Sequence, residues 1–251
     1  MTQKLYYTDP FLSKCQSIVT EIRDDGVIIL NKTIAFPEGG GQEGDRGTIR
    51  LINTNIDIEY IDTQKSLGRN LFIDDFPTIQ VDTKILHFLK NREDINKLKL
   101  GDYVEVTIDI QRRSLLSAYH TATHLMLMAI EKKYKSYESN VYGCHITDTK
   151  SRLDFRTEEK FNKEFIMEAQ DYCNTLIKRA LPIKTYQHPK EIEALYWECD
   201  GVIYPCGGTH LTNTSQIEGI CLKRKNLGKN GQRVSLEVNE IKKNFMEMFH
   251  E

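Results

Sequence analysis

The sequence predicts an α+β fold in two parts, a small β-barrel followed by a region that mixes helices with strands. Three observations lead to this prediction. Short segments of alternating apolar and polar residues, separated by turn residues, occupy the first 110 residues. A long segment with helical spacing begins at residue 110, and strand-like segments return after residue 150. We therefore predict an N-terminal domain over residues 1–110 and a second domain over residues 111–251.

The strands of the first domain are predicted from period-2 patterns. Residues 17–22 alternate, residues 24–26 (Asp-Asp-Gly) mark a turn, and residues 27–30 are apolar, which together indicate a β-hairpin. Residues 55–62 and 103–109 alternate in the same way. Residues 63–82 show no clear period, so we expect a loop or an irregular insertion there.

The second domain is predicted to begin with a long helix. Apolar residues follow helical spacing from Ile110 to about Tyr134, and neither glycine nor proline interrupts them. A second helix is expected over residues 157–180, starting at Thr157 and stopped by Leu181-Pro182. Strands are expected at residues 152–155, 183–186, 217–223 and 234–238.

Composition limits the classes of function. The chain has 251 residues with 34 Lys+Arg and 36 Asp+Glu, a formal charge of -2, so it does not bind nucleic acid by overall basicity, although a local basic patch remains open. It has no apolar run of the roughly 18 residues that a membrane span needs, and no secretory signal is visible at the N-terminus. Six scattered cysteines in a long chain are typical of reduced thiols, so we expect a cytoplasmic protein.

Two pairs of residues carry the chemistry of metal binding. His120 and His124 are four residues apart on the predicted helix, so they share a face with Cβ atoms roughly 5–6 Å apart. Thr121 stands where zinc proteases carry a glutamate, which argues against a protease. Cys206 and His210 flank two glycines and a threonine, and thiolate and imidazole are ligands that zinc prefers in sets of four. We predict a zinc site of these four residues, with either all bound or one able to swing away.

A glycine-rich segment lies in the first domain. Gly39, Gly40 and Gly41 precede Gln42, and such a run lets the backbone approach a ligand closely. The segment lacks the Gly-Lys-Ser/Thr of a phosphate-binding Walker loop, and it does not follow the dinucleotide fingerprint. A flexible hairpin and a ligand-binding loop are the two interpretations.

A basic segment lies near the C-terminus, around turn residues that include Gly228 and Gly231. It carries Lys223, Arg224, Lys225, Lys229 and Arg233, with no acidic residue between them. A solvated loop and a surface that contacts phosphates are both compatible with this pattern.

Taken together, these motifs resemble the editing domain of alanyl-tRNA synthetase and the free-standing alanyl-tRNA trans-editing proteins of the AlaX family. The resemblance rests on His-Thr-Ala-Thr-His at 120–124, Cys-Gly-Gly-Thr-His at 206–210 and Pro-Glu-Gly-Gly-Gly-Gln at 37–42. It extends to Arg-Leu-Asp-Phe at 152–155 and Gly-Gln-Arg-Val at 231–234, in the order in which the family has them. It implies a β-barrel domain joined to a zinc-binding editing domain in which a helix packs on an antiparallel sheet.

The resemblance also implies a function. The expected reaction is zinc-dependent hydrolysis, in trans, of the ester bond of mischarged tRNA(Ala), chiefly Ser-tRNA(Ala) and also Gly-tRNA(Ala). Gly40, Gly41, Gln42 and Thr123 are then expected to bind the substrate, with Thr121 as an alternative to Thr123, and the basic segment is expected to bind tRNA. The identity of a catalytic residue and the oligomeric state are not indicated.

Two other functions remain open. A threonyl-type editing domain shares the His-x3-His motif, although the complete Cys-Gly-Gly-Thr-His motif favours the alanyl type. A non-catalytic, zinc-containing tRNA-binding protein is the other alternative, and it would bind charged tRNA without changing its hydrolysis.

Overall fold

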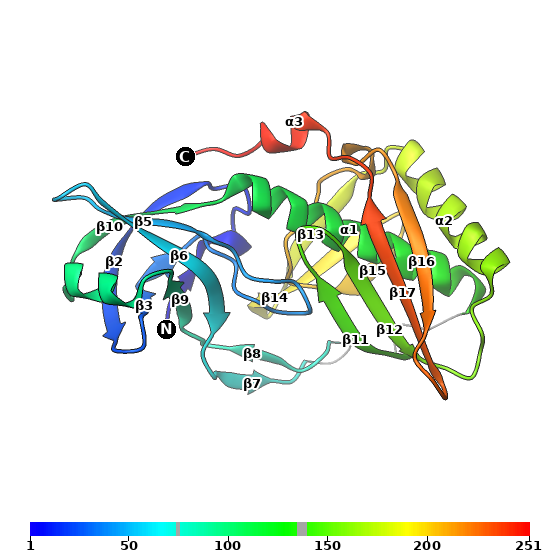
Figure 1. Ribbon diagram of the computed structural model, residues 1–251, viewed down its shortest axis with the longest axis horizontal. Coiled ribbons are helices and arrows are strands. Elements are labelled where there is room, and N and C mark those ends of the chain that lie inside the picture. The colour runs from blue at the N-terminus through cyan, green and yellow to red at the C-terminus, as the bar shows by residue number, and fades with distance from the viewer. Residues whose placement is uncertain (74–75, 135–139) are drawn as a thin grey trace.

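The structure is a computed structural model that describes residues 1–73, 76–134 and 140–251. Its N-terminal part contains β2 (Lys14–Arg23), β3 (Val27–Leu30), β5 (Gly47–Leu51), β6 (Ile56–Lys65), β9 (Ile85–Leu89) and β10 (Tyr103–Ile108). These strands close into an antiparallel barrel in the order β10-β2-β3-β9-β6-β5 (Figure 1). The predicted barrel is confirmed, as is the hairpin of β2 and β3, whose turn ends at Gly26 with a φ of 87°.

Smaller elements surround the barrel. A short parallel pair is formed by β1 (Gln3–Lys4) and β4 (Lys32–Thr33), and 3-10 helices cover η1 (Leu5–Tyr7) and η2 (Arg92–Lys97). An antiparallel ribbon of β7 (Arg69–Leu71) and β8 (Ile79–Val81) leaves the barrel (Figure 1). The expectation of a loop or an irregular insertion over residues 63–82 is therefore wrong for the residues of β7 and β8. The ribbon is two-stranded and mostly unburied, so no alternation of apolar residues marks it in the sequence.

The C-terminal part is built from two antiparallel sheets and the helices packed on them. One sheet has the order β11-β12-β17-β16 and the other the order β13-β14-β15. The strands are β11 (Val141–Ile146), β12 (Ser151–Arg156), β13 (Ile183–His188), β14 (Glu191–Cys199), β15 (Val202–Pro205), β16 (Ile220–Asn226) and β17 (Gly231–Val238). The helices are α1 (Ile110–Lys133), α2 (Lys163–Lys178), the short α3 (Lys243–Met246) and the 3-10 helix η4 (Thr214–Gln216). These elements confirm the predicted α+β class.

Helix α1 is the long helix expected from the spacing. It begins after Asp109, whose side chain accepts a hydrogen bond from the backbone N–H of Arg112 at 3.0 Å, a standard N-cap. The helix packs against α2, β12 and β17 and is buried on nearly all of its faces. His120, His124 and their neighbours are therefore held rigidly inside the C-terminal part.

Helix α2 starts later than predicted. The expected start at Thr157 is wrong, because Thr157 accepts a hydrogen bond from the N–H of Glu159 in a turn that precedes the helix. Asn162 supplies the cap instead, accepting from the N–H of Phe165 at 2.8 Å.

The buried apolar residues form two large cores, one from the chain before Asp109 and one from the chain after it. One fills the barrel with residues between Val19 and Ile108, and the other lies between α1, α2 and the sheets. Phe249 packs against both, because the C-terminal residues return to the N-terminal part, where Ser13 donates its N–H to the carbonyl of His250 at 2.7 Å. The domain boundary at residue 110 stays a prediction.

No helix among the described residues is long and apolar enough to cross a bilayer. None of the six cysteines is in a disulfide bond.

Candidate metal centre and cleft

The four predicted ligands lie together. One ligand atom from each of His120, His124, Cys206 and His210 lies within 4.8 Å of the others. The Sγ atom of Cys206 is 3.3 Å from Nε2 of His120 and 3.5 Å from Nε2 of His210. Helix α1 supplies the two histidines of the His-x3-His motif, and the loop after β15 supplies the other pair. This cluster is able to hold a metal ion.

The environment keeps the three imidazoles neutral. All three rings are buried, and burial lowers the pKa of His120 to about 3 and the pKa values of His124 and His210 well below the ordinary value. A neutral imidazole retains a lone pair, which a metal ion requires. In addition, Nε2 of His124 is buried without a hydrogen-bond partner among the described residues, so it is available as a ligand. Donor type and burial therefore both fit a bound metal.

Gln42 determines which nitrogen of His120 carries the proton. The Oε1 atom of Gln42 lies 2.7 Å from Nδ1 of His120 and 3.1 Å from the backbone N of Thr209, which can only donate. The atom that faces both must therefore be the amide oxygen, and Nδ1 of His120 must donate to it. The lone pair on Nε2 then points to the cluster, and this arrangement is typical of outer partners that orient a metal ligand.

The Cys-Gly-Gly-Thr-His loop is fitted closely to α1. A Cβ at Gly208 would lie 2.2 Å from Cε1 of His120, so only glycine fits there. The hydroxyl of Thr121 accepts a hydrogen bond from the N–H of Leu211 at 3.0 Å, and Ser117 donates to the hydroxyl of Thr209 at 2.9 Å. Thr121 is thus occupied in holding the loop.

The glycine-rich loop reaches the cluster from the barrel. Gly39 and Gln42 exchange backbone hydrogen bonds of 3.0 Å across a tight turn, in which Gly40 and Gly41 have φ values of 61° and 88°. Gly41 packs on β11, because a Cβ there would lie 2.7 Å from Sγ of Cys144. Gly40 has open space around it.

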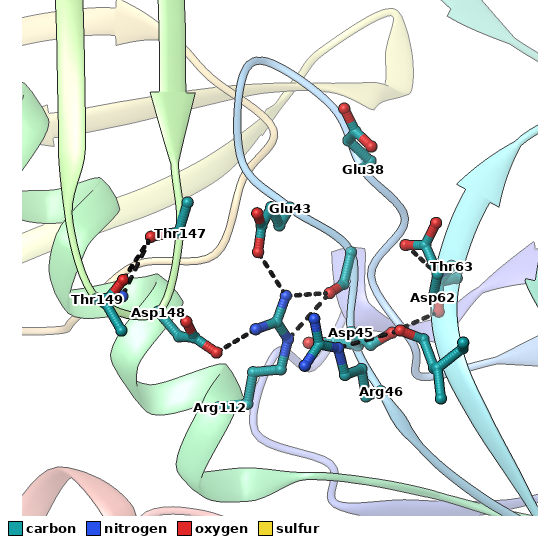
Figure 2. Close-up of polar contacts among 12 residues, drawn as sticks. Glu38, Glu43, Asp45, Arg46, Asp62, Thr63, Arg112, Thr147, Asp148 and Thr149 are labelled. Carbon is teal, nitrogen blue, oxygen red and sulfur yellow. Dashed lines mark hydrogen bonds and ion pairs between the residues drawn. The ribbon is translucent and has the colours of Figure 1, made fainter. Parts of the chain in front are cut away.

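Two adjacent arginines of α1 hold the end of this loop. Arg112 donates to Glu43 at 2.7 Å and also pairs with Asp148, and Figure 2 shows its guanidinium between the two carboxylates. Arg113 donates to Asp45 at 3.0 Å, and both of these side chains are 1% exposed. The loop that carries Gln42 is therefore tied to the helix that carries His120.

A cleft of about 670 Å³ lies over the cluster. Its size is within the range of small-molecule sites, roughly 300–1,000 Å³. Gly40, Thr123, His120, His124 and Cys206 line it. The hydroxyl of Thr123 donates to the carbonyl of Tyr119 at 2.7 Å and lies 2.7 Å from the hydroxyl of Ser151. The predicted substrate residues are thus placed differently, with Gly40 and Thr123 at the cleft and Gln42 fully buried beneath it.

The basic segment forms the β16–β17 hairpin. Arg224, Lys225 and Lys229 are exposed. Lys223 pairs with Glu237 at 2.8 Å, and Arg233 donates to Asp154 at 2.6 and 2.9 Å. The carboxylates that pair with Lys223 and Arg233 come from neighbouring strands, which a scan of the segment itself does not reveal.

Several polar residues of the cleft wall were not predicted from the sequence. Tyr7, Lys65 and Glu193 line the cleft, from η1, β6 and β14. None lies in a motif, so only their positions in the fold could have identified them.

The fold and the site define an α+β protein with a candidate metal centre. Its barrel sets a glycine-rich loop against a His₃Cys cluster that lies beneath a cleft. Residues 198–235 match the family described as "Threonyl and Alanyl tRNA synthetase second additional domain". The chain is 31% identical to the alanyl-tRNA editing protein AlaX-M of Pyrococcus horikoshii, covering 94% of this chain and 97% of that protein. It is 28% identical to AlaX-M of Methanosarcina barkeri, covering 93% and 98%. The chain belongs to the AlaX family of alanyl-tRNA editing proteins.

A longer relative matches the same region. The alanine–tRNA ligase of Saccharolobus islandicus is 31% identical over 87% of this chain. The chain spans 24% of the length of that ligase.

Proposed function

We propose that this protein is an aminoacyl-tRNA deacylase that hydrolyses the ester bond of mischarged tRNA(Ala) in trans, chiefly Ser-tRNA(Ala) and secondly Gly-tRNA(Ala). The observation that carries the proposal is the His₃Cys cluster beneath the cleft, in a chain that is similar over nearly its whole length to proteins named for alanyl-tRNA editing.

We propose zinc as the bound metal. His120, His124, Cys206 and His210 would hold it, since three neutral imidazoles and one thiolate suit tetrahedral zinc. When bound, zinc supplies a Lewis acid for the ester carbonyl. Gln42 orients His120, and Thr123 lines the cleft, with its hydroxyl 2.7 Å from that of the buried Ser151.

A separate editing site is needed because a site shaped for alanine discriminates poorly against serine. A pocket shaped for alanine rejects an analogue with one more hydroxyl by only a modest factor, on the order of 100-fold. A second site that hydrogen-bonds the serine hydroxyl discriminates more strongly, because alanine would leave buried polar groups unpaired. The hydroxyl of Thr123, which lines the cleft, is our candidate for that recognition.

We propose that the exposed cations of the β16–β17 hairpin contact tRNA phosphates. Arg224, Lys225 and Lys229 are the main candidates, because Lys223 and Arg233 already pair with carboxylates. Lys223 and Arg233 would then lie at the edge of the proposed tRNA-binding surface.

The test is deacylation of Ser-, Gly- and Ala-tRNA(Ala), with the metal content of the same preparation measured. We expect loss of serine with alanine spared, at about one zinc per chain. A Cys206→Ala, His210→Ala double variant should be inactive, and Cys221→Ala, outside the cluster, should match the wild type. Normal deacylation by the double variant would contradict the proposal.

The same assay separates the alternatives. The matched family covers threonyl as well as alanyl synthetases, so Ser-tRNA(Thr) is the competing substrate. Faster hydrolysis of Ser-tRNA(Thr) would favour a threonyl-type editing domain. Binding of charged tRNA without hydrolysis would favour a non-catalytic zinc protein.

A further inference from the structure

The wall of the cleft carries one lysine that the metal cluster does not use. Lys65 is the last residue of β6, where it pairs with Ile85 of β9, and its half-buried side chain lines the cleft. Its Nζ lies 3.4 Å from the point where a Cβ on Gly39 would stand. The ammonium group therefore sits directly against the glycine-rich turn, on the side toward the cleft.

No described carboxylate forms a close ion pair with Lys65. Among the residues that the structure describes, no carboxylate lies within 4.0 Å of its Nζ. Glu193 lies nearby on the same wall, but it pairs with Lys4, and both of these side chains are largely buried. Lys65 is also the only lysine or arginine among the described residues that line the cleft.

This environment disfavours the charged form. Burial and the neighbouring Lys4 lower the pKa of Lys65, with Glu193 acting in the opposite direction. An anion bound in the cleft would offset the desolvation of the ammonium group. The site is therefore better suited to a ligand with a negative charge than to a neutral one.

The position of Lys65 relative to the cluster indicates which anion would bind. Gly39 and Gln42 are paired across one turn, Gln42 contacts His120, and Lys65 lies on Gly39. The cluster and the lysine thus stand at opposite ends of the same turn. An aminoacyl ester carries no negative charge itself, so the nearest anion of a charged tRNA is the phosphodiester that joins its last two nucleotides.

We propose that Lys65 forms a phosphate-binding subsite, which holds the phosphodiester next to the 3′-terminal nucleotide while the ester lies at the His₃Cys cluster. The subsite rests on the proposed deacylase function. A lysine ammonium binds phosphate as a point charge, and a half-buried one does so with less screening by salt than an exposed one. The lack of a side chain at Gly39 leaves the ammonium group accessible.

The test compares two small substrates that differ by one phosphodiester. These are the seryl ester of adenosine and the seryl ester of cytidylyl-(3′→5′)-adenosine. Their hydrolysis is followed with the full-length, zinc-loaded protein and with Lys65→Met, Lys65→Arg and Lys90→Met. Lys90 is a matched control, because it pairs with Glu59 on the exposed barrel surface.

We expect the wild type to prefer the dinucleotide ester. Lys65→Met should lower kcat/KM for that ester roughly 10- to 100-fold, the range for a lost charge-assisted contact. The same variant should change the adenosine ester less than about twofold, since that ester presents no phosphodiester, while Lys65→Arg should retain part of the preference. Lys90→Met should behave as the wild type. An equal loss on both esters would overturn the subsite, because it would mean that Lys65 only stabilises the fold.

A binding measurement separates this proposal from the deacylase proposal. If the wild type hydrolyses neither ester, the deacylase function fails, and the binding of uncharged cytidylyl-(3′→5′)-adenosine against adenosine still tests the subsite by calorimetry. Tighter binding of the dinucleotide that Lys65→Met abolishes would support the subsite. Equal binding of both ligands would overturn it.

Discussion

The amide oxygen of Gln42 lies 2.7 Å from Nδ1 of His120, although the two residues are 78 positions apart and belong to different parts of the chain. The contact links the glycine-rich loop of the barrel to a ligand of the metal cluster. Because Gln42 also accepts from Thr209 and donates to its hydroxyl, one side chain joins the barrel, α1 and the Cys-Gly-Gly-Thr-His loop.

Loss of the Gln42 amide should weaken metal binding. Gln42→Ala would leave two buried donors unpaired, on His120 and on Thr209, and would free the ring of His120 to change its tautomer. We expect zinc affinity to fall roughly 10- to 100-fold, measured by competition with a chromophoric chelator. Gln16→Ala, on an exposed position of β2, is the control. Unchanged affinity in Gln42→Ala would contradict the proposed orienting role.

The buried pair of Asp45 and Arg113 should be essential for stability. Both side chains are 1% exposed, so Asp45→Asn leaves the charge of Arg113 uncompensated. We expect a loss of about 3–5 kcal/mol in the free energy of unfolding, measured with urea. Asp57→Asn breaks an exposed pair with Arg50 and should cost about 1 kcal/mol or less. Similar costs for the two variants would show that Arg113 does not depend on the pair.

The stability of the barrel should depend on pH through His87. Burial lowers the pKa of His87 to about 4, against roughly 6.5 in an unfolded chain. Below pH ~6.5 His87 binds a proton in the unfolded chain but not in the folded chain, and this favours unfolding. The contribution of His87 to stability is therefore fully present only above that pH. It is lost as the pH falls toward 4, at up to about 1.4 kcal/mol per pH unit.

The variant His87→Gln removes this titration. Between about pH 7 and pH 5, urea unfolding should show the wild type losing roughly 2 kcal/mol more than His87→Gln. An identical loss in both proteins would mean that His87 takes up its proton without unfolding.

The single tryptophan should report metal binding. Trp197 is buried and stacks on His124, with ring centroids 4.6 Å apart. We expect its fluorescence to change when zinc is added to metal-free protein and to saturate at one equivalent. The Cys206→Ala, His210→Ala variant should show no such change at these concentrations. A full response in that variant would place the metal elsewhere.

The basic hairpin should contribute to tRNA affinity in a salt-dependent way. Removing Arg224 and Lys225 together should weaken binding and reduce the slope of log K against log salt by about 0.7–0.9 for each lost phosphate contact. Lys90→Ala should leave the slope unchanged. Arg233→Ala is less informative, because it also leaves Asp154 without one of its two arginines. A slope that stays the same in the Arg224, Lys225 variant would exclude the hairpin from the interface.

Local patterns in the sequence were sufficient for much of the fold. The hairpin at Gly26 and the helix from Ile110 were predicted with the observed limits to within a few residues, because turn chemistry and helical spacing act over short distances. The ribbon of β7 and β8 was missed for the corresponding reason, since it buries no regular face. The start of α2 was misplaced because Thr157 and Asn162 are both suitable caps, and in the structure it is Asn162 that caps the helix.

Donor chemistry and the spacing of each pair are local properties, so the residues that can bind a metal were predictable from the sequence. How those residues are supported depends on the folded chain. The tertiary structure brought Gln42 beneath His120, buried Asp45 against Arg113, and placed Lys65 on the cleft wall. The physical reason is that burial and charge compensation depend on segments that meet only when the barrel docks on α1, and no local pattern encodes that contact.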